Sequence, residues 1–419
     1  MIKKIKNIYK IFGPGILMAT AAIGGSHLVS STQAGALFGW SLAIFILLIN
    51  FFKYPFFLAN VQYTMATKKS LIEGYASLGN SWLWLFTILA VIAAVVNTAA
   101  VSMFAASLLG YFIPIKLTIN ILSFIIIFAC ILILIAGKYN LLNNVSKIIM
   151  ITLSIATVVA VVMAVTKDVN SALADDFISP SAWTIASLGF IVILTGWMPA
   201  PIEISSIGSI WLKNQIKQTN INAKNALLDF NVGFIVTAIL AIFFLALGAL
   251  VLHGSAYEFK DGIAFSHQLV TMYSTVIGDW SRLLIAFIAF ACMFGTSITV
   301  IDGYGRAVAE AFSLIRKNRS ASNRSVAVWT IFISIIGFLI IIYFASSMRT
   351  MLDFAMILSF TTTPIFAFLN YKLVRSTKLP KELQNGMFLN ILSICGLIFL
   401  FGFLILFIIY RWFPFLIGL

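Results

Sequence analysis

Charge is scarce in this chain. Only 10% of its 419 residues are Asp, Glu, Lys or Arg, and just 13 residues are acidic. A soluble globular domain has about 25% charged residues, so this scarcity, together with a hydrophobic content of 61%, excludes an ordinary soluble domain. Long polar stretches are missing as well, and the polar segments present are too short to build a core of their own. The sequence therefore predicts a single integral membrane domain over residues 1–419.

Catalytic and metal-binding motifs are also absent. The three cysteines, Cys130, Cys292 and Cys395, lie within apolar segments without the spacing of metal ligands, which indicates packing roles. The chain has no phosphate-binding loop, no paired zinc ligands and no Ser/His/Asp arrangement. We therefore expect neither an enzyme nor a bound cofactor, and ATP-driven transport has no support within the chain.

Long hydrophobic runs are what the chain does have. About 20 consecutive apolar residues suffice for a helix to cross a bilayer. Runs of this kind predict an all-α membrane protein with eleven spans, at 12–39, 41–66, 82–110, 116–137, 145–166, 182–211, 229–252, 281–305, 325–347, 350–371 and 388–412.

The basic residues divide unevenly between the two sides that these spans define. Twenty of the 27 fall on the side of the N-terminus and six on the other side, while Lys53 falls within the second span. Lys and Arg concentrate in cytoplasmic loops. The pattern predicts a cell inner (plasma) membrane protein with a cytoplasmic N-terminus and a C-terminus on the opposite side. The net charge of +14 is then a topology signal, and we expect a lipid bilayer rather than nucleic acid around the chain.

Two of the spans carry helix-breaking residues at their middle. The first contains Gly24-Gly25-Ser26-His27, and the sixth contains Met198-Pro199-Ala200-Pro201. Unwound backbone is tolerated in a membrane only where it is buried in protein or lines a cavity. Interrupted spans at matching places in two halves indicate a transporter binding site. We expect inverted repeats at 12–166 and 182–371, with 388–412 as an additional helix.

The residues at these breaks are the predicted substrate site. They are Gly24, Gly25, Ser26, His27, Met198, Ala200 and Glu203. Glycine pairs free backbone carbonyls, and His27 could be a ligand, a proton carrier, or a neutral imidazole bonded to the backbone. Glu203 could cap the half-helix after Pro201, or serve as a cation site or a proton-coupled acid.

The eighth span supplies candidates for coupling or gating. Asp302 and Arg306 are four residues apart and can pair on one helical face. The hydroxyls of Thr296, Ser297 and Thr299 could hold a sodium ion together with freed carbonyls, or could bond the carbonyls of their own helix. We expect Lys53, which precedes Pro55, to neutralise an acid on a neighbouring span.

Around the breaks the chain resembles the NRAMP family of divalent-metal transporters. Gly13-Pro14-Gly15 and Gln33-Ala34-Gly35-Ala36 are similar to that family's first helix, and Met198-Pro199 is similar to the Met-Pro of its sixth. The resemblance implies a LeuT-type fold, a 5+5 inverted repeat plus an eleventh helix with helices 1 and 6 broken. It also implies a secondary transporter that works by alternating access, moves a divalent metal cation and is coupled to protons or sodium.

The departures from the family leave the substrate open. The family carries Asp-Pro-Gly-Asn where this chain has residues 24–27, and Met-Pro-His where it has Met198-Pro199-Ala200. The span at 82–110 also lacks the acids of the family's proton relay. Either His27, Met198 and Glu203 form a metal site of another geometry, or the scaffold carries a small non-metal solute, such as an amino acid or organic ion. An uncoupled channel or facilitator is a third hypothesis.

Overall fold

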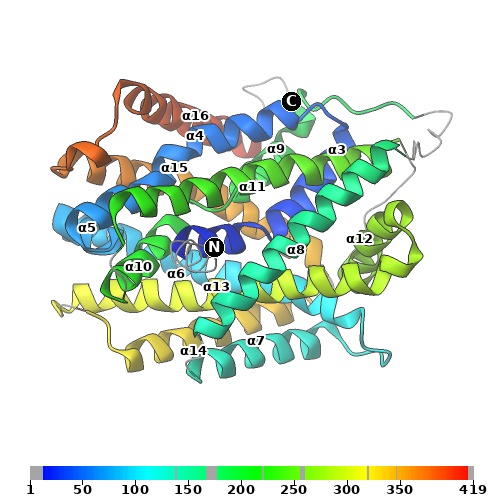
Figure 1. The fold of residues 1–419 in the computed structure, drawn as a ribbon, viewed down its shortest axis with the longest axis horizontal. Coiled ribbons are helices and arrows are strands. Elements are labelled where there is room, and N and C mark those ends of the chain that lie inside the picture. The colour runs from blue at the N-terminus through cyan, green and yellow to red at the C-terminus, as the bar shows by residue number, and fades with distance from the viewer. Residues whose placement is uncertain are drawn as a thin grey trace, which may run out of the picture.

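The protein is a bundle of helices in which most long helices run roughly side by side (Figure 1). The computed structural model describes residues 13–136, 139–166, 177–218, 221–254, 260–318, 320–345 and 347–413. Within these residues, the regular secondary structure is helical throughout. The all-α architecture expected from the hydrophobic runs is therefore confirmed.

Each expected span coincides with helical structure in the described residues. The nine unbroken spans are α4 (Ala43–Thr67), α6 (Asn80–Gly110), α7 (Ile119–Ile135), α8 (Tyr139–Thr166), α11 (Ala223–Val251), α13 (Arg282–Ile315), α14 (Asn323–Tyr343), α15 (Met348–Ser376) and α16 (Met387–Trp412). The first span consists of α2 (Pro14–Ala22), the π-helix η1 (Ser26–Ser31) and α3 (Thr32–Phe38). The sixth consists of η2 (Ile185–Ser187), α9 (Leu188–Trp197) and α10 (Ile204–Gln218).

Two connecting helices are additions to the expected pattern, α5 (Leu71–Leu78) and α12 (Gly262–Ile277), along with the short turns η3 (Asp279–Ser281) and η4 (Lys381–Leu383). A capping box starts α5, because Ser70 Oγ accepts from the Glu73 amide and Glu73 Oε2 accepts from the Ser70 amide. Serine followed three residues later by glutamate is the sequence signal of such a helix start. The short length of α5 hid it from a search for membrane spans.

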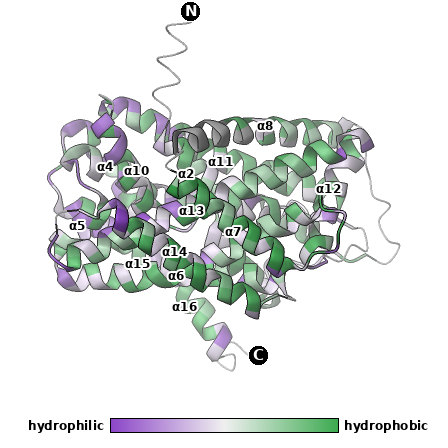
Figure 2. Cartoon of the chain, turned by 90° about the horizontal axis from the view of Figure 1, so that it is seen from below, coloured by the Kyte–Doolittle hydropathy of each residue, from purple (hydrophilic) through white to green (hydrophobic). Residues whose placement is uncertain are grey.

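The surface of the bundle is that of a multi-pass membrane protein. Among the described residues, seven helices are each long and apolar enough to cross a bilayer. The central helices α6 and α13 are 78% buried over their apolar windows, whereas α14 and α16 are only 28% buried. Most residues of these outer helices are hydrophobic, and hydrophilic residues gather at the ends of the bundle, notably around α5 (Figure 2). The outer helices are therefore the ones that face lipid.

Glycines allow the third piece of the broken first span to pack directly on α11. A Cβ on Gly35 would lie 1.9 Å from Leu245 O, and a Cβ on Gly248 would lie 2.1 Å from Thr32 O. Small residues let membrane helices approach closely enough for backbone contact. This contact fixes α3, the C-terminal piece of the broken first span, against the unbroken helix α11.

Replacing Gly248 by alanine tests this packing. Because the new methyl would overlap the Thr32 carbonyl, we expect Gly248→Ala to destabilise the purified protein by about 1–3 kcal/mol, the usual range for overpacking. The matched control is Gly402→Ala on α16, where a Cβ would have open space around it. Thermal unfolding in detergent compares the two variants, and equal melting temperatures would contradict the close contact.

Candidate functional site

The first helix break is short and its carbonyls are satisfied by α13. Helix α2 ends at Ala22, and the chain resumes helical structure at Ser26. Cys292 Sγ donates to Ile23 O at 3.0 Å, and Thr296 Oγ1 lies 3.1 Å from Thr20 O. Two side chains of α13 therefore take up backbone oxygens next to the break.

Gly25 lets the second broken helix approach the first. A Cβ on Gly25 would lie 2.4 Å from the Trp197 ring, whereas a Cβ on Gly24 would lie 3.1 Å from Thr296 and 3.4 Å from Met293 Sδ. The indole of Trp197, the last residue of α9, thus packs directly against the glycine backbone. Larger residues at position 25 would push the two breaks apart.

The second break follows directly from two prolines. Helix α9 ends at Trp197 and α10 begins at Ile204, so residues 198–203 are unwound. Proline lacks the backbone donor that a helix interior requires, and Pro199 and Pro201 both fall here. The opening expected around residues 196–201 is therefore present, displaced by about two residues toward the C-terminus.

Lys53 of α4 reaches this break. Its side chain is fully buried, and its Nζ donates to Thr195 O at 2.6 Å, with Gly196 O and Ala200 O both at 3.4 Å. We expected Lys53 to neutralise an acid on a neighbouring span. Among the described residues its hydrogen-bond partners are backbone carbonyls, and Glu203 of the sixth span is an acid that acts on it electrostatically. Pro199 leaves the Thr195 oxygen without its helical donor.

A small cavity lies between the two breaks. It has a volume of about 30 Å³, and about 10–15 Å³ is needed to hold one water molecule. In this conformation it therefore has room for an ion with little water, but not for an aromatic amino acid. Its lining residues come from the first, third, sixth and eighth spans and are Ala21, Ala22, Gly25, Ser26, Asn97, Val101, Trp197, Ala200, Pro201, Ile204, Thr296, Val300 and Tyr304.

A hydrogen-bonded chain leads from this cavity to Glu203. Trp197 Nε1 donates to Asn97 Oδ1 at 3.1 Å, and Asn97 Nδ2 donates to Tyr304 Oη at 2.8 Å. Tyr304 Oη in turn donates to Glu203 Oε1 at 3.1 Å. Glu203 is 2% exposed, and its Oε2 has no hydrogen-bond partner among the residues that the structure describes. The buried Glu203 carboxylate is thus connected to the cavity through the hydroxyl of Tyr304, which lines it.

Four residues of the predicted substrate site lie at the cavity or next to it. Gly25, Ser26 and Ala200 line it, and Glu203 contacts it through Tyr304. Glu203 immediately precedes α10, and its carbonyl accepts from the Ser206 amide at 2.9 Å. The position at the start of the half-helix is close to the one expected, whereas the role in substrate binding stays a prediction.

His27 and Met198 point elsewhere in this conformation. His27 Nε2 donates to Thr237 O at 2.9 Å, and Nδ1 lies 2.7 Å from Ser26 Oγ, which also donates to Ala22 O. The imidazole packs edge-on against Phe244 of α11. Met198 is fully buried in an apolar cluster with Phe38 and other side chains. These positions match the backbone-bonded alternative for His27 and an apolar packing role for Met198.

The coupling candidates on α13 also divide. Thr296 lines the cavity. All three hydroxyls, those of Thr296, Ser297 and Thr299, bond carbonyls of their own helix, and Ser297 Oγ also lies 3.2 Å from Val101 O of α6. Arg306 Nε lies 2.8 Å from Asp302 Oδ2, so the ion pair inferred from their spacing is formed. A part in gating or sodium binding stays a prediction for Thr296, Ser297, Thr299, Asp302 and Arg306.

Side chains with the usual chemistry of a metal site do not gather here. Within the described residues, no three His, Cys, Asp or Glu side chains come together as possible ligands. Most residues that line the cavity are apolar, and the hydroxyl and amide side chains among them are those of Ser26, Asn97, Thr296 and Tyr304. Neutral oxygens of this kind suit hard cations such as Mg²⁺ or Mn²⁺, which retain some of their water.

Three residues that shape the site, Asn97, Trp197 and Tyr304, were not predicted from the sequence. Asn97 is the amide in a span without any ionisable side chain, and a buried amide in a membrane helix usually bonds across to another helix. That signal could have identified it. Trp197 and Tyr304 carried no such signal, because aromatic residues are common throughout the chain.

Comparison with known proteins places the chain among membrane transporters. Residues 15–410 match the model of the natural resistance-associated macrophage protein-like (NRAMP) family. An uncharacterized protein of Pasteurella multocida is 48% identical over 402 residues, which cover 96% of this chain and 92% of that protein.

Solved structures share the fold at low sequence identity. A manganese transporter of Eremococcus coleocola superposes with a TM-score of 0.73 at 15% identity, covering 96% of this chain and 87% of that one. MhsT in complex with L-phenylalanine gives a TM-score of 0.66 at 12% identity, covering 93% of this chain and 98% of that one. The expected LeuT-type fold with breaks in helices 1 and 6 is therefore confirmed.

Removing the Tyr304 hydroxyl tests the hydrogen-bonded chain. In Tyr304→Phe, the buried Asn97 amide and the Glu203 carboxylate both lose a partner, and a buried polar group left without one costs about 1–3 kcal/mol. Tyr343→Phe is the control, because Tyr343 is 84% exposed. We expect a lower melting temperature for Tyr304→Phe alone. A shift no larger than that of the control would show that the chain of contacts does not hold the site together.

Proposed function

The chain belongs to the NRAMP family of secondary transporters, and on this premise we propose that it moves a divalent metal cation by alternating access. The proposed path runs through the cavity between the two broken helices. The observation that carries the proposal is the pairing of these breaks around a mostly apolar cavity whose polar lining residues are Ser26, Asn97, Thr296 and Tyr304. Freed backbone and half-helix ends are how such transporters bind ions near the middle of the membrane.

The proposed metal site differs from that of the family. Gly24 stands where the family has a carboxylate, and Ala200 stands where it has a histidine. In this proposal, hydroxyl and amide oxygens around the cavity coordinate a partly hydrated hard cation. Glu203 supplies the negative charge through Tyr304. It is also our candidate for carrying a coupling proton, since its Oε2 is buried and has no hydrogen-bond partner within the described part of the chain.

A small non-metal solute is the second candidate substrate. It is favoured by the lack of a metal-ligating cluster among the described residues, and by the buried positive charge of Lys53 beside the cavity-lining Ala200. MhsT, which shares the fold, was solved with L-phenylalanine. A solute of that size requires a wider cavity than the present one, and therefore another conformation.

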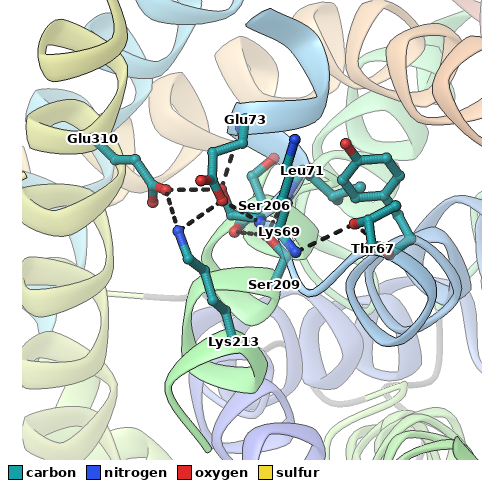
Figure 3. Close-up of polar contacts among 10 residues, drawn as sticks. Thr67, Lys69, Leu71, Glu73, Ser206, Ser209, Lys213 and Glu310 are labelled. Atoms are coloured by element: carbon teal, nitrogen blue, oxygen red, sulfur yellow. Dashed lines mark hydrogen bonds and ion pairs between the residues drawn. The ribbon is translucent and has the colours of Figure 1, made fainter. Parts of the chain in front are cut away.

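An ion-pair cluster at one end of the bundle supports alternating access. Lys213 Nζ of α10 lies 2.6 Å from Glu73 Oε2 of α5 and 3.1 Å from Glu310 Oε1 of α13 (Figure 3). Ser70 Oγ donates to Glu310 Oε1 at 2.9 Å. We propose that this cluster holds the end of the bundle near α5 closed. Following the distribution of basic residues, we assign this end to the cytoplasm of a bacterial-type inner membrane.

Restoring the family's carboxylate tests the location of the site. A side chain at position 24 would meet Thr296 and Met293 Sδ, both of which can adjust. We expect Gly24→Asp to strengthen Mn²⁺ binding at least about tenfold, equivalent to about 1.4 kcal/mol. Gly24→Asn, which has the same shape without the charge, should leave it unchanged. Calorimetric titration of the purified proteins measures both. A folded Gly24→Asp protein without stronger binding would move the metal site away from the first break.

Uptake into proteoliposomes tests the substrate class. The proposal expects saturable, counter-transported Mn²⁺ or Mg²⁺ flux, since a channel would neither saturate in this way nor exchange. Saturable flux of an amino acid or organic ion, with no flux of either metal, would instead select the second candidate.

Removing the cation of the ion-pair cluster tests the closed end. Lys213→Met leaves two carboxylates facing each other, so α5 should detach more readily from α10 and α13. We expect backbone amide exchange in α5 to accelerate by about tenfold, equivalent to about 1.4 kcal/mol of local stability. Lys217→Met is the matched control, because Lys217 lies exposed on the same helix. Unchanged exchange in α5 would remove the cluster from the closing mechanism.

A further inference from the structure

A fully buried lysine approaches the unwound segment of the sixth span. Lys53 lies in α4 at membrane depth, with 0% of its side chain exposed. A charged side chain in this environment is costly and is found mainly where it has a function. No Asp or Glu oxygen among the described residues lies within 4.0 Å of its ammonium, although Glu203 acts on it electrostatically.

The carbonyls around the ammonium are those that the break releases. Thr195 O would accept from residue 199 in a continuous helix, but Pro199 has no N–H. Ala200 O is released as well, because the Ile204 amide donates to Pro201 O instead. Carbonyls at the C-terminal end of a helix also carry partial negative charge. Three oxygens at 2.6–3.4 Å from Lys53 Nζ match the three donors of an ammonium group.

Such a set of oxygens is the kind that holds a small cation. Where transporter helices are unwound, freed carbonyls and half-helix C-terminal ends coordinate the coupling cation. Here the side chain of the same protein occupies that place. One of the three oxygens belongs to Ala200, which lines the cavity, so the lysine also withdraws a cavity-side carbonyl from any external ion.

We propose that Lys53 is a tethered cation that fills the carbonyl site at the break in helix 6. Its charge then influences which charge a ligand of the neighbouring cavity can carry. The inorganic ion that these carbonyls would otherwise bind is then unnecessary. The proposal relies on the proposed function only for the position of the cavity. Lys53 is a specificity-determining residue in this account, and its positive charge weakens the attraction of the cavity for cations.

Emptying the carbonyl site should make the protein responsive to small cations. Lys53→Met keeps the length and apolar stem of the side chain but removes the ammonium. We expect this variant to melt several degrees lower than wild type in a buffer whose cation is N-methylglucamine. Sodium, ammonium or methylammonium at equal ionic strength should restore the melting temperature in a saturable manner. Wild-type protein should be indifferent to the same exchange.

A matched control separates this effect from the loss of any buried hydrogen bond. Gln62 lies on the same helix, is 2% exposed and donates to Leu383 O at 2.9 Å. Gln62→Met should lower the melting temperature without a response to small cations. Lys53→Gln, which keeps a neutral donor, provides a second variant if Lys53→Met does not fold, and it should show a weaker but saturable response.

The outcomes distinguish this proposal from the proposed function. A folded Lys53 variant that ignores all three small cations, or a wild-type protein that itself requires one, would overturn the tethered cation. Metal flux plays no part in that readout. The other informative outcome is a Lys53 variant that responds to small cations, together with a wild-type protein that transports no divalent metal. That outcome would support the tethered cation and refute only the proposed metal substrate.

Discussion

The structure depends on a single requirement, that backbone groups released in the middle of a membrane must find partners inside the protein. No water reaches the hydrocarbon region, so each peptide group without a partner costs several kcal/mol. At the first break, the side chains of Cys292 and Thr296 meet this requirement. At the second break, the ammonium of Lys53 meets it. The two breaks are therefore stable without any bound ion at these particular oxygens.

Because the released backbone groups find their partners within the protein, a cavity can form where the two breaks face each other. Gly25 brings the Trp197 ring against the first break, and Asn97 and Tyr304 tie both to the central helices α6 and α13. The polar groups of the cavity are thereby positioned by unbroken, well-packed helices. These polar groups are uncharged. The charge near the cavity therefore depends on two side chains, the acid Glu203 and the base Lys53.

Most of the fold could be predicted from the sequence, because hydrophobic length and helix-breaking residues are local signals. The eleven spans and both breaks follow from runs of apolar residues and from Gly24, Gly25, Pro199 and Pro201. The connecting helices α5 and α12 were missed, since neither is long enough to cross a bilayer. The inverted-repeat boundaries and the orientation of the termini stay predictions.

The site could be predicted less fully, because its contacts join residues far apart in the chain. Gly25, Ser26 and Ala200 lie at the breaks and line the cavity, while their part in substrate binding stays a prediction. The sequence could not show that His27 turns toward Thr237, more than 200 residues away. Nor could it show which oxygens Lys53 reaches, since that depends on how α4 packs beside α9 and not on any pattern within either helix.

Anomalous X-ray diffraction from crystals grown with Mn²⁺ tests the central claim most directly, that the facing breaks form the substrate site. The account predicts an anomalous peak between Ser26 and Ala200, with the Lys53 ammonium still on the Thr195 carbonyl. A peak elsewhere in the bundle, or continuous helices with no cavity between them, would contradict it.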